Sequence, residues 1–166
     1  MTNTEHRQKA QRLVETYSDL ILRVCYTYLK STQDAEDICQ ETLLKLLYTN
    51  CSFVSPAHEK AWVIRTASNA CKDLLKSAAR TRNCALDACA DQAAPAEAEG
   101  SSVLDAVQAL PEEYREVIYL HYYEGYNLKE IGAMLAIPPA TVGTRLARGR
   151  QRLRTILGED LHENCI

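Results

Sequence analysis

The residues with the clearest chemistry in this sequence are arginines clustered near its C-terminus. The segment from 140 to 157 contains Arg145, Arg148, Arg150, Arg152 and Arg154 and no acidic residue. The guanidinium group stays charged and presents a planar fork of donors, which fits phosphate oxygens and the acceptor edge of guanine. The segment therefore indicates binding to a nucleic acid rather than catalysis.

Two short helical patterns would position these arginines. Asn127 and Glu130 have the spacing of a capping box, and apolar residues follow them at helical intervals. Ile137-Pro138-Pro139 ends this helix, because proline lacks an amide donor and its ring clashes with the preceding turn. A second helix is expected from about residue 140. This order is typical of a helix-turn-helix whose second helix enters the DNA major groove. The alternative is an ordinary helical hairpin with a solvated basic face.

Charge is segregated along the chain, although the net charge is only −3. Residues 60–82 carry six basic side chains and one acidic one, a net charge of +5. Residues 83–105 carry five acidic side chains and no basic one. Two basic segments are thus separated by an acidic one, which predicts two separate anion-binding surfaces.

The hydrophobic pattern predicts an all-α fold of two small helical domains joined by an acidic flexible linker, with the helix-turn-helix at the C-terminal end. Helices are expected at about 5–29 and 33–48, from Pro56 onward, at 103–110 and from 111. Large apolar residues almost vanish from 83 to 102, which predicts the linker. The expected domains are therefore residues 1–82 and 103–166.

Residues expected in the core recur every three or four positions. In the helix that begins near 111, Tyr114, Val117, Ile118 and either His121 or Tyr122 should face inward. The other expected core residues are Leu13, Tyr17, Leu20, Ile21, Val24, Tyr28, Ile38, Leu43, Leu46, Leu47, Trp62, Ile64, Ala67, Cys71, Leu74, Leu75, Leu128, Ile131, Met134, Leu135, Val142, Leu146, Leu153, Ile156 and Leu157. Gly125 fits a left-handed helix end.

A second set of chemically useful side chains is acidic. Asp34, Asp37 and Glu41 are spaced by three and four residues and so share one helix face, with Gln40 beside them. Acids at a helix start also suit the helix dipole, an equally good reading for Asp34. Glu41 lies beyond the first turn, where a basic partner is the better explanation.

Several function classes are disfavoured by the sequence. It contains no C-x-x-C, nucleophile elbow or glycine-rich phosphate loop, so neither an enzyme, a metal site nor a cofactor is expected. The seven cysteines are odd in number and are expected to be free and mostly buried. No apolar run long enough to span a membrane and no signal peptide is evident, so a soluble cytoplasmic protein without membrane contact is expected.

Two stretches of the chain resemble the extracytoplasmic-function sigma factors, small two-domain initiation subunits of bacterial RNA polymerase. The first runs from Asp34-Ala35-Glu36-Asp37 and Gln40-Glu41 to Trp62 through Arg65, Asn69 and Asp73. The second runs from Leu110-Pro111-Glu112-Glu113-Tyr114-Arg115 to Thr141-Val142 and Arg145-Leu146. The resemblance implies a promoter-recognising initiation factor that binds core RNA polymerase at its β′ coiled coil and β flap, binds promoter DNA, and is commonly held inactive by an anti-sigma factor.

The resemblance also implies roles for individual residues. The core polymerase contacts would be Asp37, Gln40 and Glu41. Contacts with the −10 promoter element and its single strand would be Arg65, Asn69, Lys72, Lys76 and Arg80. Contacts with the −35 element would be Thr141, Thr144, Arg145, Arg148, Arg150 and Arg152, the last two being suited to phosphates or to the polymerase flap.

The sequence departs from the family pattern at a few positions. Ser68 replaces a common basic residue, Pro138 replaces a common capping residue, and Gly143 replaces a common lysine. Trp62 fits a core position better than a base-stacking platform. The alternative function is an autonomous helix-turn-helix regulator, but it leaves the acidic face of Asp37 and Glu41 without a use.

Overall fold

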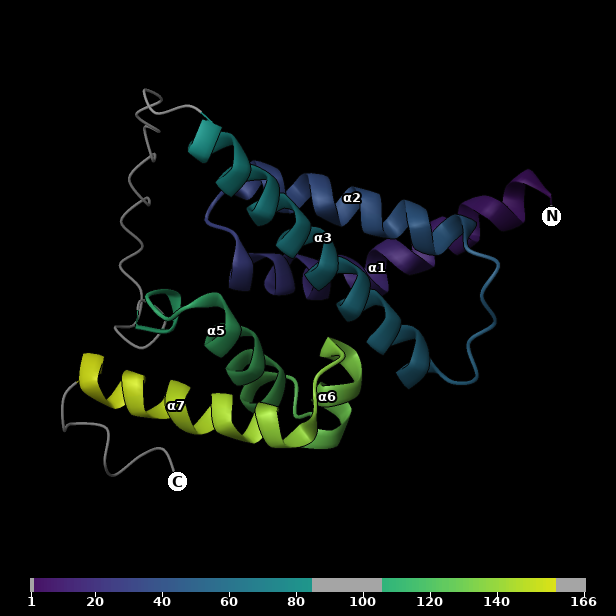
Figure 1. Cartoon of the computed structure of the whole chain (residues 1–166). Coiled ribbons are helices and arrows are strands. Elements are labelled where there is room, and N and C mark those ends of the chain that lie inside the picture. The colour runs from purple at the N-terminus through teal and green to yellow at the C-terminus, as the bar shows by residue number, and fades with distance from the viewer. Residues whose placement is uncertain (1, 85–105, 158–166) are drawn as a thin grey trace. The chain divides into compact units, whose positions relative to one another are not determined.

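A computed structural model describes residues 2–84 and 106–157 of the chain (Figure 1). All regular secondary structure in these two ranges is helical, as expected from the sequence. The chain divides into two compact units, an N-terminal unit of residues 1–90 and a C-terminal unit of residues 91–166. No helix within the described ranges is long and apolar enough to cross a membrane.

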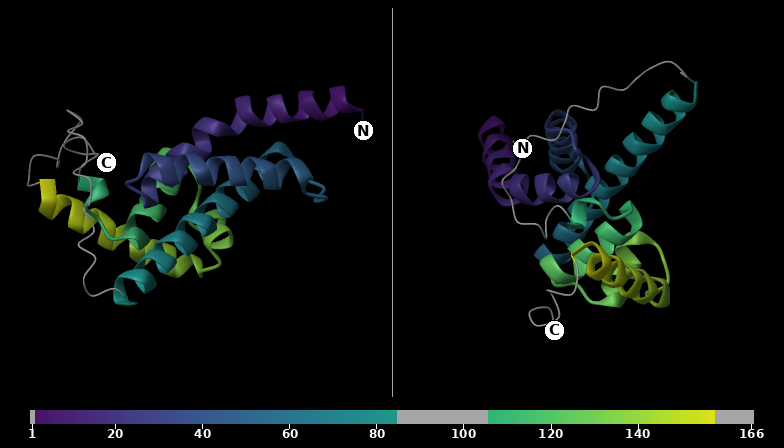
Figure 2. Two further views of the ribbon diagram at one scale, coloured as in Figure 1. Left: turned by 90° about the horizontal axis from the view of Figure 1, so that it is seen from above. Right: turned by 90° about the vertical axis from the view of Figure 1, so that its left-hand side faces the viewer.

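The N-terminal unit consists of three long helices: α1 (Asn3–Tyr28), α2 (Thr32–Tyr48) and α3 (Pro56–Cys84). Both α2 and α3 pack against α1 and also against each other (Figure 2). The predicted cap at Ser31 is present, because the Ser31 Oγ accepts the backbone N–H of Asp34 at 3.2 Å. Residues 83 and 84, which the sequence assigned to the linker, are the last residues of α3. Residues 85–102 of the predicted linker lie outside the described residues.

The core of the N-terminal unit lies where the three helices meet. Leu13, Ile21, Leu46 and Ile64 are each at most 1% exposed, as their spacing predicts. Val63 is also fully buried, which the sequence pattern missed because it immediately precedes Ile64. Consecutive residues of a helix point about 100° apart, so Val63 and Ile64 fill neighbouring parts of the core.

Three of the cysteines in this unit are buried free thiols, namely Cys25, Cys39 and Cys71. Burial, reinforced by nearby Cys25 and acidic groups, raises the pKa of Cys39 to about 11. A thiol with such a pKa is a poor nucleophile at neutral pH. Cys51 is also free but does not share the expected burial, because it lies exposed in the loop between α2 and α3.

Polar contacts fix α1 against the two other helices. The Lys9 ammonium donates to the carbonyl oxygen of Leu47 at 3.0 Å and thereby satisfies the C-terminal end of α2. The Tyr17 hydroxyl donates to Glu59 Oε1 at 2.7 Å, and Arg12 reaches the same oxygen at 3.3 Å. Glu59 therefore joins the first turn of α3 to α1.

The C-terminal unit contains α5 (Glu112–Ile118), a π-helical turn η1 (Tyr119–Tyr123), α6 (Leu128–Leu135) and α7 (Pro139–Leu157). A short helical segment at 106–108 precedes them, and residues 103–105 of the predicted helix at 103–110 lie outside the described residues. α7 packs against both α5 and α6. The core side chains between them are Tyr114, Val117, Ile118, Leu120, Ile131, Met134, Val142 and Leu146.

The π-helical turn corrects one sequence prediction. A continuous α-helix would have buried His121 or Tyr122, but Leu120 is buried instead, at 2% exposure, and Tyr122 is 56% exposed. The Glu124 N–H donates to the Tyr119 carbonyl five residues back, which widens the turn and changes the angle at which later side chains leave the helix. Two other residues expected in the core are likewise exposed, Leu128 at 39% and Ile156 at 48%.

The connection between α6 and α7 has the geometry of a helix-turn-helix. Asn127 and Glu130 form the predicted capping box at the start of α6. Ala136 ends α6 in the left-handed conformation, with φ 57°, and Pro139 begins α7. A Cβ added at Gly132 would lie 2.7 Å from the carbonyl oxygen of Ile137, so the tight turn requires glycine there.

Candidate nucleic-acid and polymerase interfaces

An acidic face lies on α2, in the N-terminal unit. Asp37, Gln40 and Glu41 are all exposed, so the spacing argument placed them correctly on the solvent side of the helix. Glu41 forms an ion pair with Lys45 one turn later, at 2.7 Å, with both side chains more than half exposed. Such a surface pair exchanges partners easily, which leaves Glu41 able to meet a cation on another protein.

A groove between α2 and α3 collects some of these acids. It has a volume of about 540 Å³, and its lining includes Asp34, Asp37 and Glu41 from α2 and Asn69 and Asp73 from α3. Asn69, expected at a single-stranded DNA site, therefore borders the same groove as two of the expected polymerase contacts. Gln40 is not part of this lining.

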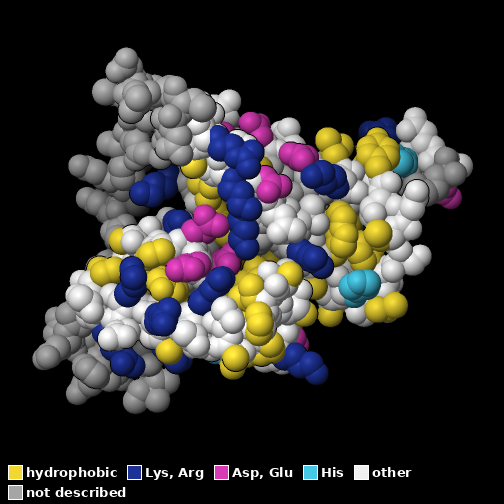
Figure 3. Space-filling model, in the orientation of Figure 1, with side chains coloured by type: hydrophobic (Ala, Val, Ile, Leu, Met, Phe, Trp, Pro, Cys, Tyr) yellow, Lys and Arg dark blue, Asp and Glu magenta, His cyan; other side chains and the backbone are white. Residues whose placement is uncertain are grey.

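The predicted basic residues of α3 follow one side of that helix. Arg65, Lys76 and Arg80 are exposed, as is Asn69. The Lys72 ammonium lies 5.9 Å from the ring centroid of Tyr28 at the end of α1, a distance suited to a cation–π contact. Figure 3 shows a row of dark-blue side chains running over α3, with magenta side chains close beside it. The row can follow a nucleic-acid backbone, since its spacing keeps the positive charges on one face.

Aromatic side chains order the loop that leads into α3. The Phe53 ring meets Trp62 edge-on, with centroids 5.8 Å apart, and meets His58 at 5.4 Å. The Val54 N–H donates to His58 Nδ1 at 3.3 Å, so His58 accepts through that nitrogen. Trp62 is partly buried and packs on Phe53, a packing role like the one that its position in the apolar pattern favoured.

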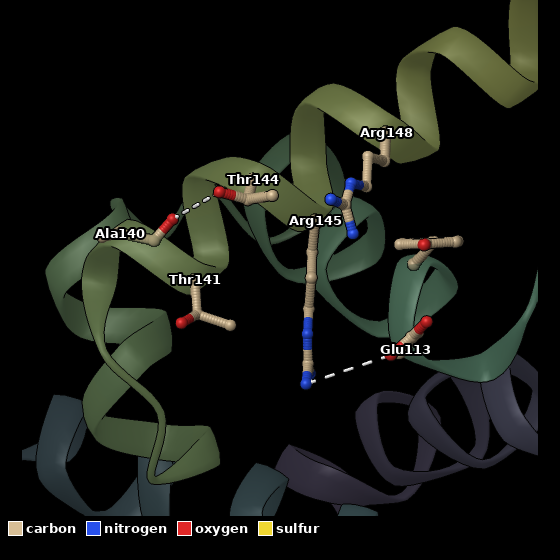
Figure 4. A pocket seen from close by; sticks show the side chains of 7 residues that line it. Glu113, Ala140, Thr141, Thr144, Arg145 and Arg148 are labelled. Carbon is tan, nitrogen blue, oxygen red and sulfur yellow. Dashed lines mark hydrogen bonds and ion pairs between the residues drawn. The ribbon is translucent and has the colours of Figure 1, made fainter.

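α7 carries five arginines of the C-terminal unit. Thr141, Thr144, Arg145 and Arg148 line a shallow pocket of about 380 Å³ together with Glu113 and Tyr114 of α5 (Figure 4). Four of the six residues predicted to contact the −35 element thus lie together. The Thr144 hydroxyl donates a hydrogen bond to the Ala140 carbonyl oxygen at 3.0 Å. This bond fixes the orientation of the methyl group and the hydroxyl oxygen of Thr144.

Arg145 contacts carboxylates of α5 from this pocket. Its guanidinium lies 3.5 Å from Glu116, whose side chain is only 3% exposed, and 4.0 Å from Glu113. The sequence did not indicate these partners, because they lie about 30 residues earlier and sit among apolar core positions. Arg145 is therefore held on the side of α7 that faces α5. Arg148 and the two threonines line the outer part of the pocket.

The remaining two predicted −35 residues lie outside the pocket. The Arg152 guanidinium lies over the ring of Tyr114, 5.0 Å from its centroid. Arg150 projects from the other flank of α7 and donates from Nη1 to the Tyr122 hydroxyl at 2.8 Å. Between the two flanks, the outermost residues from 140 to 151 are small or uncharged: Ala140, Thr144, Ala147 and Gln151; Arg154 adds a charge only in the last turn. A neutral ridge between basic flanks matches a major groove, whose floor exposes base edges and whose rims are phosphates.

Comparison with known proteins agrees with this geometry. Residues 13–81 match the family model of sigma-70 region 2, and residues 101–153 match that of sigma-70 region 4. The ECF RNA polymerase sigma factor SigW of Bacillus subtilis is 32% identical over 161 residues, covering 86% of this chain and 85% of SigW. The chain belongs to the extracytoplasmic-function sigma factors. Members of this family direct RNA polymerase to promoters as initiation factors.

One further relative and one solved structure are similar to this sigma factor. SigE of Mycolicibacterium smegmatis is 31% identical over 164 residues, and the match spans 92% of this chain but only 63% of SigE. The solved structure of the sigma factor RpoE of Bartonella quintana, in complex with the anti-sigma factor NepR, shares the fold with a TM-score of 0.70. That match has 21% identity and covers 90% of this chain and 97% of RpoE.

Within the described ranges, no three His, Cys, Asp or Glu side chains gather as they would around a metal ion. Exposed acidic side chains lie on α2, and exposed basic side chains lie on α3 and α7. Their arrangement suits binding to a protein surface and to nucleic acid.

Proposed function

We propose that this sigma factor binds core RNA polymerase through α2 and recognises the two promoter elements with its two units. The observation that supports it best is α7, where arginines flank a neutral ridge at the exposed face of a helix-turn-helix. Region 4 in the C-terminal unit would read the −35 element, and region 2 in the N-terminal unit would bind and help to open the −10 element.

Individual residues take the following roles in this proposal. Asp37, Gln40 and Glu41 meet basic side chains of the β′ coiled coil, where charge-assisted hydrogen bonds give both strength and register. Arg65, Asn69, Lys72, Lys76 and Arg80 hold the −10 strand. Thr141, Thr144, Arg145 and Arg148 face base edges and nearby phosphates, while Arg150 and Arg152 contact phosphates or the β flap. The acidic segment from 85 to 102 joins the two activities.

The protein acts in this proposal by binding alone, in the cytoplasm and without a catalytic centre or cofactor of its own. An anti-sigma factor is a further proposed partner, because the related RpoE was solved in complex with the anti-sigma factor NepR. Competition between that partner and core polymerase would switch the factor off.

The test is co-elution with purified bacterial core RNA polymerase on a sizing column. An Asp37→Arg, Glu41→Arg double variant should bind more than about tenfold more weakly than wild type, because each change places a cation opposite a cation. A Glu15→Arg, Asp19→Arg variant makes the same change in net charge on exposed positions of α1 and should bind normally.

Failure of well-folded wild-type protein to co-elute would contradict the proposal. If that protein nevertheless bound a particular duplex by itself, it would act as an autonomous helix-turn-helix regulator. Equal losses in the two double variants would show that net charge, rather than the α2 face, governs binding.

A further inference from the structure

Tyr122 belongs to the π-helical turn η1 and contacts the recognition helix α7, but the proposed function gives it no role. Its side chain is 56% exposed, yet its hydroxyl oxygen accepts a hydrogen bond from Arg150 Nη1 at 2.8 Å. The two residues are 28 positions apart, so the contact joins η1 to α7 across the unit. An exposed arginine on a helix ordinarily samples many rotamers, whereas this one is held at its tip.

The π-helical turn is the reason that Tyr122 reaches Arg150. Leu120 takes the core position of the turn at 2% exposure, and the additional residue in the π turn directs Tyr122 outward. Without the π turn, the helical spacing would place Tyr122 in or near the core. A π turn inside a helix weakens its hydrogen bonding and is often found at functional positions.

A neighbouring side chain fixes the orientation of the Tyr122 ring. His121 meets that ring edge-on, with centroids 4.9 Å apart and an interplanar angle of 78°. His121 is in turn 2.8 Å from the carbonyl oxygen of Tyr126 through Nδ1. Since a carbonyl oxygen only accepts, the hydrogen lies on Nδ1 and the imidazole ring is held in place. A continuous series of contacts therefore runs from the backbone of Tyr126 through the side chains of His121 and Tyr122 to Arg150.

We propose that Tyr122 is a positioning residue for DNA recognition, holding the Arg150 guanidinium ready for a phosphate on one rim of the groove. The inference rests on the proposed function, in which α7 enters the major groove. Arg145 and Arg148 lie on the opposite flank of α7, because residues 145 and 150 differ by about 140° around a helix. Arg150 thus serves the second rim, and ordering it before binding reduces the entropy lost on contact.

The phenol suits this role better than a carboxylate would. A neutral oxygen accepts one guanidinium hydrogen and leaves the full positive charge and the other donors available to a phosphate. A carboxylate in the same place would offset part of the charge, as Glu116 does for Arg145. Arg150 is thus ordered by a neutral group and available to a phosphate, whereas Arg145 is ordered by an ion pair.

The test uses holoenzyme assembled from core polymerase and full-length variants. The probe is a duplex that the wild-type holoenzyme selects from a randomised pool, and binding is measured over a range of salt concentrations. Arg150→Ala should weaken binding about tenfold at low salt and reduce the slope of log affinity against log salt by about one, the loss of one phosphate contact. Tyr122→Phe removes only the hydroxyl and should weaken binding about fivefold, the effect of one hydrogen bond.

The deciding measurement is the double variant. If Tyr122 acts through Arg150, then Tyr122→Phe has no further effect in the Arg150→Ala protein. Tyr123→Phe is the matched control, since it removes one hydroxyl from a neighbouring tyrosine that is 67% exposed, and it should bind as wild type. A purely structural hydroxyl would give the same loss with or without Arg150 and would lower the melting temperature.

Each contrary result has its own meaning. Equal losses from Tyr122→Phe in both backgrounds, or no loss at all, overturn the positioning role. Arg150→Ala holoenzyme with wild-type affinity overturns the phosphate contact and with it this inference, while the proposed function stands. A wild-type holoenzyme that selects no duplex overturns the proposed function itself.

Discussion

The two units present their charged residues in different ways. On α2 the acidic residues stand out from a long helix, and the ion pair of Glu41 with Lys45 is more than half exposed on both sides. On α7 three arginines are held by residues of the preceding helices: Arg145 by Glu116, Arg150 by Tyr122 and Arg152 by Tyr114. The first surface can rearrange to meet a partner, and the second is arranged in advance.

The cores differ in a corresponding way. Long helices in the N-terminal unit meet through large apolar side chains, such as Ile21 and Leu46. In the C-terminal unit, helices and the turn between α6 and α7 approach closely where glycine allows it. A Cβ at Gly149 would lie 2.7 Å from Ile118 Cδ1, and one at Gly132 would lie 2.7 Å from a backbone oxygen. The N-terminal unit should therefore be sensitive to lost volume, and the C-terminal unit to added volume.

The largest expected effect is the loss of a core side chain from the N-terminal unit. Ile21→Ala removes a fully buried side chain where all three helices meet, and should lower the unfolding free energy of that unit by about 2–5 kcal/mol. Trp62 is the single tryptophan and lies in this unit, so its fluorescence reports the unit selectively. Urea unfolding followed by fluorescence should shift strongly, whereas the circular dichroism signal of the C-terminal unit should keep its midpoint.

Val14→Ala is the control for this prediction, because Val14 is on the same helix but 49% exposed. It should change the unfolding free energy by less than about 0.5 kcal/mol. A common shift of both units in the Ile21→Ala protein would show that they unfold together, and the comparison of two separate cores would then fail.

The next effect concerns the buried carboxylate beneath the recognition helix. Arg145→Met leaves Glu116, with 3% of its side chain exposed, without its arginine, and should destabilise the C-terminal unit by about 2–3 kcal/mol. Lys45→Met removes the partner of Glu41 on α2 and should cost less than about 0.5 kcal/mol. Thermal unfolding by circular dichroism measures both. Similar costs for the two variants would mean that the pairs are equally exposed in solution.

Adding volume in the helix-turn-helix gives a somewhat smaller effect. Gly132→Ala should destabilise the C-terminal unit by about 1–3 kcal/mol, because its Cβ meets a backbone oxygen that cannot turn away. Gly143→Ala should stabilise the same unit by up to about 1 kcal/mol, since its Cβ would make an ordinary 3.9 Å contact with Leu128 and alanine favours helix. Opposite shifts in melting temperature are the expected result, and a stabilised Gly132→Ala protein would disprove the close approach.

Local signals explain what could be predicted from the sequence. The caps at Ser31 and Asn127 were predictable because a capping side chain bonds to a backbone amide only a few residues away. Apolar spacing likewise located Leu13, Ile21 and Leu146 in the core, since helix geometry alone decides which residues share a face. The fold class followed from these two kinds of signal, and the family followed from motifs in both units.

Contacts between distant residues account for what the sequence could not predict. The π turn at Tyr119–Tyr123 changes the register of one helix by a single residue, and no periodicity in the letters marks it. The buried partner of Arg145 belongs to another helix, so no local pattern in the sequence marked Glu116 as that partner. The need for glycine at position 149 could not be predicted either, because it arises from the packing of Ile118 against that position. Each depends on how helices meet, which a linear pattern does not record.

The smallest predicted effect depends on pH and tests the tether between α1 and α3. Burial by itself raises the pKa of Glu59, but the hydrogen bonds from Tyr17 and Arg12 and the charges of Arg12 and Lys9 outweigh it, so the pKa lies below its ordinary 4.5. A lowered pKa in the folded state means that the ionised carboxylate stabilises the fold. That stabilisation is complete above pH 4.5 and is lost as the pH falls through the folded-state pKa.

Glu59→Gln should therefore lower the unfolding free energy of the N-terminal unit by about 1 kcal/mol at pH 7, and the difference from wild type should shrink below pH 4.5. Trp62 fluorescence in urea at several pH values measures this difference. Glu36→Gln removes an exposed carboxylate of α2 and should follow wild type throughout. If the difference in unfolding free energy between wild type and Glu59→Gln stayed constant down to pH 3, packing rather than charge would account for the contribution of the Glu59 side chain. The N-terminal unit would then contain no arranged charge comparable to those on α7.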